Sequence, residues 1–443
     1  MLTRVLRIAL VVALSLEFQV AVKAQASPSS ESPMLRPAPV SDRPYRTEVG
    51  LEERSNFISG SINAGAGYID NLYPGTGNGQ LSEKIISLQP GIEFDTKSAR
   101  EHTSVSYNPG FIFYEPSSEL NESDQDAVFR FDYLFSPRLT MNLSDMLLRS
   151  STGFAQIGNG GISGSAAATT PGVIVPYGNR FSNDATGGLS YQISPHSMIG
   201  SSGNGDKLDF SNSSQTAGLY NSVSYGGRGF YNYRLSASQY LGGIYEFGQS
   251  NTDSTIGQYG TQTHTIDAFY TIYLAKAFSL SVAGGPQHFH GDIAPNPATH
   301  GWTPAVAASM GWQNLHTSFA ADFSRTVNGG GGLFGAFYST SADAIGRWQI
   351  SRLWDAGLMV NYTINKSASP QLDLNTPGLN SLGGHTFATS LSLGRTLSPH
   401  TNARLRYDRI QNRYGGIPSL ATNPSSDRIM LSFTWQFQRP IGR

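Results

Sequence analysis

Large apolar residues alternate with small or polar residues over most of the chain after Asn56. The last such segment shows the pattern best, with apolar Ile429, Leu431, Phe433, Trp435 and Phe437 alternating with Met430, Ser432, Thr434 and Gln436. Successive side chains of a β-strand point to opposite faces, so one face of this segment is apolar and the other is mostly polar. The segment fits a strand whose outer face meets lipid, and a strand of a soluble β-sandwich is the alternative.

The same period of two recurs along the chain, and helical spacing is almost absent. Examples of apolar faces are Ile86/Leu88/Ile92/Phe94, Phe129/Phe131/Tyr133/Phe135, Ile266/Ala268/Tyr270/Ile272/Leu274 and Trp354/Ala356/Leu358/Val360/Tyr362. Counting such runs predicts about 18 strands, with about 16 or 20 as alternatives. An even number of antiparallel strands would place both chain ends on the same side of a membrane.

The connections between these runs fall into two classes. Short turns rich in Ser and Pro, which suit tight hairpins, are Phe135–Arg138, Ile193–His196, Leu235–Ser238, Leu274–Ala277, Ile350–Leu353 and Leu397–His400. Longer polar segments rich in Gly are Asp70–Ser82, Glu115–Asp126, Ser150–Arg180, Asn251–Gly260, His290–His300, Asn328–Leu333, Asn365–His385 and Gly415–Ser426. Short and long connections alternate, which predicts an all-β transmembrane antiparallel barrel with short periplasmic turns and long extracellular loops.

Composition agrees with such a barrel. Charged residues make up 14 % of the chain, Gly accounts for 49 residues and Phe for 23, yet mean hydropathy is −0.25. Past the N-terminus no apolar run is long enough for a membrane helix. The net charge of −1 gives no indication of nucleic-acid binding. Cysteine is absent, which excludes disulfides, thiolate metal sites and a cysteine nucleophile.

The chain divides into three parts. Residues 1–26 resemble a secretory signal peptide, with Arg4 and Arg7 before the apolar core Ile8–Leu16. Its cleavage site would be Val22-Lys23-Ala24 or Ala24-Gln25-Ala26. Residues 27–55 are rich in Pro and Ser and predict a flexible periplasmic linker. Residues 56–443 form the predicted barrel.

Two short strings carry a family resemblance. Gly67-Tyr68-Ile69-Asp70-Asn71-Leu72-Tyr73 and Leu88-Gln89-Pro90-Gly91-Ile92 resemble the opening of a family of outer-membrane β-barrel porins, although Ile69 stands where an acidic residue is more usual. The resemblance implies the outer membrane of a Gram-negative bacterium, with lipid, lipopolysaccharide and the barrel assembly machinery as partners. Relatives of that family often sit beside exopolysaccharide genes, so the resemblance implies a link to exopolysaccharide export.

Charged residues on the polar faces are the candidate functional residues. Alternation places toward the lumen Arg130, Arg228, Arg234, Arg347, Arg404, Arg406, Asp132, Asp267 and Asp408. Charge inside a barrel is tolerated where water fills the lumen. These groups either stiffen the wall as salt bridges or create a local field that selects solutes. Arg404 and Arg406, with Asp408 above them, form the best candidate cluster.

Other motifs carry little chemistry. The segment Ser150–Arg180, with Gly158, Gly160 and Gly161, is long enough to fold inward and constrict the lumen. Its glycines lack the Lys and Ser/Thr of a phosphate-binding loop. His288 and His290 lack an evident third metal ligand. We therefore expect no metal, no cofactor and no enzyme activity.

The sequence thus favours a pore for passive or weakly selective passage of small hydrophilic solutes. One alternative is an accessory to exopolysaccharide export or surface assembly, for which inward rings such as Phe230, Phe269 and Tyr273 would stack on sugars. A structural or adhesive surface protein is the other alternative.

Overall fold

The computed structural model describes residues 56–72, 82–152, 154, 177–211, 219–254, 257–275, 277–293, 296–368, 383–414 and 425–440. All of them belong to one compact unit, Pro33–Arg443. The predicted signal peptide and linker, residues 1–26 and 27–55, lie outside the described residues. Within the described ranges no helix is long and apolar enough to cross a membrane.

Eighteen strands and one short 3-10 helix make up the described part of the chain. They are β1 (Phe57–Asp70), β2 (Glu83–Lys97), β3 (Glu101–Glu115), η2 (Ser118–Leu120), β4 (Glu122–Ser136), β5 (Leu139–Thr152), β6 (Tyr177–Ser194), β7 (Ser197–Phe210), β8 (Asn221–Ser236), β9 (Gln239–Ser254), β10 (Gly257–Ala275), β11 (Phe278–Ile293), β12 (Asn296–Gln313), β13 (Thr317–Gly330), β14 (Leu333–Gln349), β15 (Trp354–Ser367), β16 (Gly384–Ser398), β17 (Thr401–Tyr414) and β18 (Ser425–Pro440).

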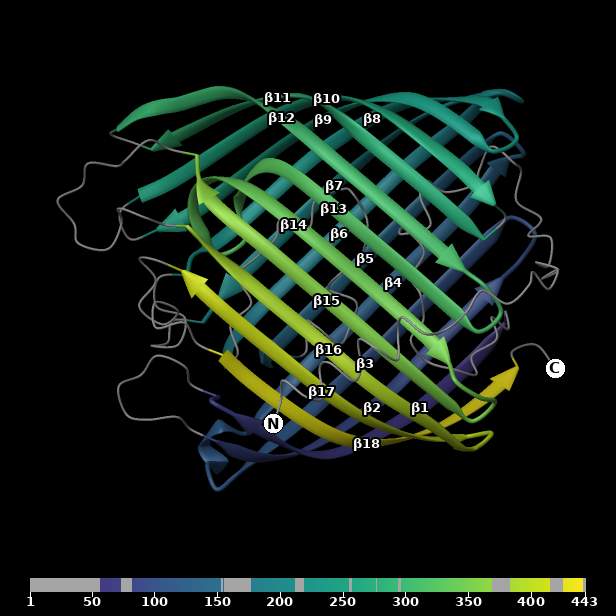
Figure 1. Cartoon of the computed structure of the whole chain (residues 1–443), viewed down its shortest axis with the longest axis vertical. Coiled ribbons are helices and arrows are strands. Elements are labelled where there is room, and N and C mark those ends of the chain that lie inside the picture. The colour runs from purple at the N-terminus through teal and green to yellow at the C-terminus, as the bar shows by residue number, and fades with distance from the viewer. Residues whose placement is uncertain are drawn as a thin grey trace, which may run out of the picture. The chain divides into compact units, whose positions relative to one another are not determined.

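Every strand pairs antiparallel with its neighbours in sequence, and β1 also pairs with β18, so the sheet closes on itself (Figure 1). The predicted closed antiparallel barrel of 18 strands is therefore confirmed. Phe57 at the start of β1 stands opposite Pro440 at the end of β18. We call the rim that holds these two residues the terminal rim, and the opposite one the loop rim. The short turns such as Phe135–Arg138 lie at the terminal rim.

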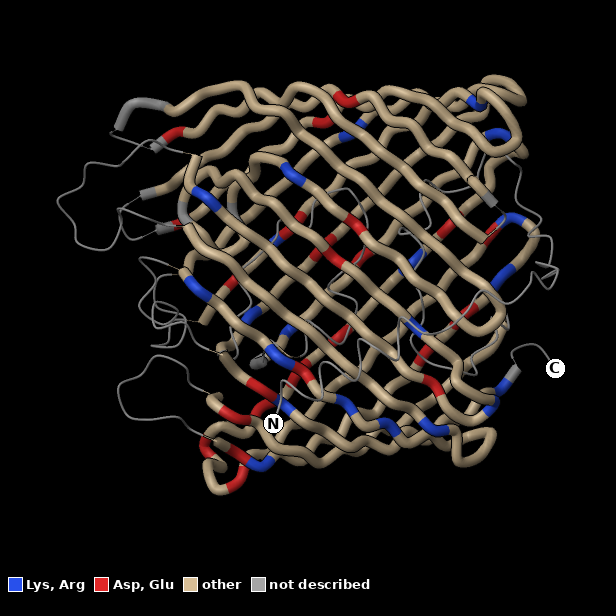
Figure 2. Tube along the Cα trace, viewed as in Figure 1, with Lys and Arg blue, Asp and Glu red and all other residues tan. Residues whose placement is uncertain are grey.

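The outward face of the barrel is apolar. Ile429, Leu431, Phe433, Trp435 and Phe437 are each close to half exposed, as are large apolar residues on most other strands. Figure 2 shows that most of the strand length carries no charged residue. A continuous apolar band of this kind is stable against lipid rather than water. The two faces of the last strand are thus the ones that the sequence predicts.

Two segments that the sequence predicts as long loops are mostly β-strand, so these two predictions are wrong. Most of Asn251–Gly260 lies in β9 and β10, and most of His290–His300 lies in β11 and β12. These strand ends are rich in Thr, Gln, Asn and Gly. They extend the wall with polar residues on both faces, so the apolar alternation that marks a membrane-embedded strand is missing there.

Candidate functional site: the charged lumen and its inner hairpin

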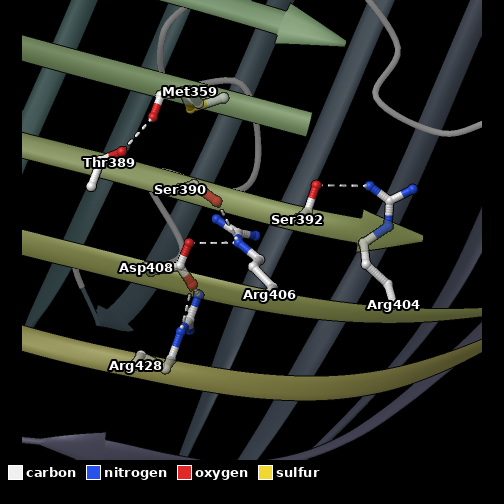
Figure 3. A network of polar contacts seen from close by, with 8 residues as sticks. All are labelled: Met359, Thr389, Ser390, Ser392, Arg404, Arg406, Asp408 and Arg428. Carbon is white, nitrogen blue, oxygen red and sulfur yellow. Dashed lines mark hydrogen bonds and ion pairs between the residues drawn. The ribbon is translucent and has the colours of Figure 1, made fainter. Parts of the chain in front are cut away.

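A row of arginines lines the inner face of β17 and β18. Arg406 donates from Nε to Oδ1 of Asp408 at 2.6 Å and to the hydroxyl of Ser390 at 3.0 Å. From β18, Arg428 donates to the other carboxylate oxygen of Asp408 at 2.7 and 3.0 Å (Figure 3). Asp408 is fully buried between the two guanidinium groups. The carboxylate therefore fixes two arginines against the wall.

Arg404 extends the row toward the terminal rim. Its Nη2 lies 3.3 Å from Oδ2 of Asp355 on β15, and its Nη1 lies 3.5 Å from the hydroxyl of Ser392 (Figure 3 draws the second contact). Arg404, Arg406 and Asp408 share a face because they are two residues apart on one strand. The structure places these three residues side by side on the inner face, with Arg428 and Asp355 as further members of the cluster.

The opposite wall carries carboxylates. In a closed sheet of 18 strands, β8 lies half a turn away from β17. Asp184 of β6 stands opposite Asp206 of β7, and Arg228 of β8 stands opposite Glu246 of β9. The carboxylate of Asp267 on β10 also interacts electrostatically with Arg228. Around its middle, the lumen therefore has an arginine-rich wall facing a wall with four carboxylates and one arginine.

The remaining lumen candidates lie apart from this arrangement. Arg130 and Asp132 lie on the inner face of β4, where His102 Nδ1 approaches Asp132 at 3.8 Å. Arg234 lies near the terminal rim on β8 and Arg347 on β14. All four point to the inner face, as predicted, but the structure does not bring them together.

Several charged residues were missed at the sequence level. They are Arg428, Asp355, Asp184, Asp206 and Glu246. Glu246 and Asp355 lie between apolar or small outward neighbours, so the alternation could have found them. Asp427 beside Arg428, Asn183 beside Asp184 and Lys207 beside Asp206 interrupt the apolar pattern and obscure the other three. Their pairing could not be found, because the strand-to-strand register decides which of them meet.

Toward the loop rim, β13 of the hairpin β13–β14 separates from β12, while β14 stays paired with β15 as far as Phe337 opposite Ser367. β13 pairs with β12 only from Ser318 to Arg325, opposite Val306–Gln313. Pro304 of β12 stands opposite Pro286 of β11. In an antiparallel ladder, two prolines can face each other only at a pair that exchanges no hydrogen bonds with each other. The backbone nitrogen of Pro304 therefore points away from β11, toward the side where β13 would pair, and it has no hydrogen to donate there. The ladder between β12 and β13 ends at this position.

Gln287 of β11 holds the hairpin inside the barrel. Continued register would set Val327 of β13 against Pro304. Instead the Val327 N–H donates to Gln287 Oε1 at 2.6 Å, and Gln287 Nε2 donates to the Val327 carbonyl at 3.0 Å. A side-chain amide thus replaces the missing strand partner, and both backbone groups are satisfied.

Glycines let the hairpin tip pass close beneath the wall. A Cβ on Gly329 would lie 2.6 Å from the hydroxyl of Thr261 on β10. Gly331 and Gly332 at the turn have φ of 67° and 88°, which favours glycine. The carbonyl of Gly332 accepts from the N–H of Tyr220 at 3.1 Å. The tip therefore reaches from β12 to the start of β8, and Asn328–Leu333 is not the extracellular loop that the sequence predicts.

Two apolar clusters line the lumen near the loop rim. In the first, Val327, Leu333, Ala336 and Phe337 of the hairpin pack with Tyr259, Phe289 and Tyr414 of the wall. The second contains Ile69, Leu72, Ile85, Tyr114, Phe154, Ala388 and Ile410. Among the described residues, the inner hairpin is therefore a main element that narrows the lumen.

The constriction expected from Ser150–Arg180 stays a prediction, because most of this segment lies outside the described residues. Phe154 is fully buried in the second cluster, and the guanidinium carbon of Arg428 lies 4.6 Å from the centre of its ring. The start of this segment thus enters the lumen next to the arginine row. Gly158, Gly160 and Gly161 lie outside the described residues.

Rings also line the inner wall. Phe230 lies over Gly200 of β7, and Phe269 lies over Gly242 of β9, so close that a Cβ on either glycine would collide with the ring. Tyr273 packs edge-on against Tyr240. All three rings point inward, as the alternation predicts.

The part of the chain that the structure describes shows no metal site. The described residues hold no group of three or more His, Asp or Glu side chains that could bind a metal ion. His290 lies 3.0 Å from Asp292, and His288 contacts Trp302 on the outward face.

Comparison with known proteins gives similarity of fold. No protein-family model matches the chain, and no curated protein matches it. The FrpB iron transporter from Neisseria meningitidis (F5-1 variant) is 10 % identical with a TM-score of 0.45, covering 88 % of this chain and 83 % of that one. OccAB4 from Acinetobacter baumannii is 10 % identical with a TM-score of 0.41, covering 88 % and 100 %. The outer membrane protein opdK from Pseudomonas aeruginosa is 9 % identical with a TM-score of 0.41, covering 86 % and 99 %. Identities of 9–10 % do not indicate that this chain shares the function of any of these proteins.

Proposed function

We propose that the chain is an outer-membrane pore of a Gram-negative bacterium that passes small hydrophilic solutes by passive or weakly selective diffusion. The apolar outward band supports insertion among outer-membrane lipid and lipopolysaccharide by the barrel assembly machinery. The observation that carries the proposal is the separation of charge across the lumen. Arg404, Arg406 and Arg428 line one wall, and Asp184, Asp206, Glu246 and Asp267 line the opposite wall.

Such a field acts on a solute only at short range. In water of physiological salt, charge is screened beyond roughly 8 Å. Phe154 lies against Arg428 of the arginine row, and the inner hairpin narrows the lumen nearer the loop rim, so we expect a passing solute to come within this range of the arginines. Arg404 and Arg406 keep about a quarter of their side-chain surface exposed, at 23 % and 24 %, and can attract an anion. The balancing carboxylates across the lumen keep the selectivity weak.

The test is single-channel recording in a planar bilayer under a salt gradient. Replacing both Arg404 and Arg406 by Glu should move the reversal potential toward cations. The milder pair Arg404→Gln and Arg406→Gln should move it less, in the same direction. Arg409→Glu is the matched control, because Arg409 lies on the outward face of the same strand. An unchanged reversal potential in both double variants would contradict the proposed effect of the arginines on ion selectivity. A folded barrel that gives no single-channel current would contradict the proposed pore.

A second candidate is an accessory to exopolysaccharide export. The observation that favours it is the position of Phe230 and Phe269, which lie over glycines of the inner wall and remain partly exposed. Rings placed in this way can stack on sugars. If this function holds, long neutral oligosaccharides should block the ionic current, and Phe230→Ala with Phe269→Ala should relieve the block.

A further inference from the structure

Six tight turns at the terminal rim carry a basic residue. All six of these residues are exposed, and they are Arg100, Arg138, His196, His316, Arg352 and His400. None of their side chains forms a hydrogen bond or an ion pair with another residue that the structure describes. Glu101 is the only acidic residue in the described part of these six turns. We call the six residues the basic rim, because they place uncompensated cations and N–H donors around one end of the barrel.

One hydrogen-bond pattern fixes five of the six residues at the same position of the turn. A Ser or Asn side chain two positions earlier accepts from the backbone N–H of the basic residue, at 2.8–3.3 Å. The carbonyl of the basic residue accepts from a backbone N–H of the next hairpin, at 2.6–2.8 Å. The backbone of each turn is therefore held on both sides, and each basic side chain extends from a fixed point of the rim.

The turn itself does not require a basic residue at this position. In the turn between β8 and β9, Ser236 accepts from the backbone N–H of Ser238 at 3.2 Å, and the Ser238 carbonyl accepts from Tyr273 at 2.8 Å. Between β14 and β15, Leu353 takes the same position. Both turns keep the hydrogen bonds without a base, so the basic side chains are not explained by the structure of the turn.

The apolar outward band of the barrel continues up to these turns. Five of the six turns include or border an exposed apolar side chain, 46–63 % exposed, namely Phe135, Ile193, Leu315, Leu353 and Leu397. Apolar side chains at a membrane surface contact the acyl chains, while basic groups next to them stay at the level of the head groups. The basic rim therefore lies at the level of the lipid phosphates.

We propose that the basic rim binds the head groups of anionic phospholipids, such as phosphatidylglycerol, in the leaflet at the terminal rim. In the orientation that the sequence predicts, this is the periplasmic leaflet. The arginines donate to phosphate oxygens, and the neighbouring apolar residues contact the acyl chains. The attraction falls off within a Debye length of the surface. This inference rests on the proposed place of the barrel in a membrane, but not on conduction through the lumen.

The test is quenching of tryptophan fluorescence by brominated lipids, with the full chain reconstituted in vesicles. Trp348, Trp354 and Trp435 are exposed on the outward face near the terminal rim, so they report which lipid surrounds the turns. At low salt, brominated phosphatidylglycerol should associate about two- to fivefold more tightly than brominated phosphatidylcholine. Raising the salt concentration should remove most of this preference.

Two changes to the basic rim should shift this preference in opposite directions. Replacing Arg100, Arg138 and Arg352 together by Gln should bring the ratio of the two association constants close to one. Ser238→Arg should raise the ratio, because it adds a cation at a turn that keeps the same hydrogen bonds. All four side chains are exposed in turns, so the barrel should fold in both variants.

The matched control removes three cations from the other end of the barrel. Lys84, Arg149 and Lys366 are exposed on the outward face near the loop rim, and replacing all three by Gln should leave the ratio unchanged. An equal ratio in wild type and in the variant of the basic rim would overturn the proposal. Equal losses in the two triple variants would also overturn it, because net charge alone would then explain the preference.

The proposal and the proposed pore can fail separately. A lipid preference in a barrel that gives no single-channel current would support the basic rim and contradict the pore. Quenching by neither lipid would show that the chain does not enter the bilayer, and would overturn both.

Discussion

The side-chain amide of Gln287 forms two hydrogen bonds with the backbone of Val327, one as acceptor at 2.6 Å and one as donor at 3.0 Å. This pair joins the inner face of β11 to a strand that has left the wall. Both partners are buried, so neither backbone group of Val327 has an aqueous alternative. This side chain thus satisfies the hairpin backbone at the point where β13 leaves β12, in addition to the apolar contacts that the hairpin makes with the wall.

Gln287→Leu should release the hairpin. The change leaves the N–H and the carbonyl of Val327 without partners, at a cost of about 1–3 kcal/mol for each buried group. We expect larger or more variable single-channel conductance together with an unchanged barrel by circular dichroism. Gln262→Leu, on the outward face of β10, is the control. An identical conductance for wild type and Gln287→Leu would mean that other contacts hold the hairpin.

Gly329→Ala should displace the hairpin tip. The added Cβ would lie 2.6 Å from the hydroxyl of Thr261 and 2.7 Å from its Cβ. Overpacking of this kind costs about 1–3 kcal/mol. Gly205→Ala on β7 is the matched control, since its Cβ would meet no atom within 4 Å. Faster proteolysis near residue 330 in Gly329→Ala, and not in Gly205→Ala, is the expected result.

Asp408→Asn should destabilise the barrel more than Asp427→Asn. Asp408 is fully buried between Arg406 and Arg428, and its loss leaves buried cations without their counter-charge, at about 3–5 kcal/mol. Asp427 pairs with Arg409 on the outward face and is 30 % exposed, so its loss should cost about 1 kcal/mol or less. Urea unfolding in lipid vesicles measures both. Equal losses of unfolding free energy in Asp408→Asn and Asp427→Asn would show that water fully solvates the arginine row.

Phe433→Arg should weaken the last strand. Phe433 is 49 % exposed on the outward face, where a charge near mid-membrane costs about 2–4 kcal/mol. Thr434→Arg points into the lumen and loses one hydrogen bond of 3.3 Å to Asn63, so it should cost about 1 kcal/mol. The fraction of heat-modifiable folded barrel on a gel compares the two. A greater loss for Thr434→Arg would reverse the assignment of the faces.

The barrel was predictable because one rule acts locally and repeatedly. Alternation at Ile429–Phe437 and similar segments specifies which side chains face lipid, and strand number follows from counting. The inward direction of Arg404, Arg406 and Asp408 follows from the same rule. Arg428, which directly precedes Ile429–Phe437, also points inward by the same alternation.

The inner hairpin was not predictable in the same way. Asn328–Leu333 has the Gly-rich composition of an exposed loop, and nothing local distinguishes a loop that points outward from one that folds inward. The decisive contacts join residues far apart in the sequence, such as Gln287 with Val327 and Phe337 with Tyr414. Pro304 was the available signal, because a proline within a strand marks an edge.

The pairing of β1 with β18 along Phe57–Asp70 and Asp427–Pro440 sets an order on biogenesis. The partner of the first strand of this barrel is the last of its eighteen described strands in the chain. Until β18 arrives, the other strands form at most an open sheet with two unpaired edges and an apolar face, which invites aggregation in water. Removing the C-terminal strand should therefore yield a chain that never closes, rather than a narrower barrel.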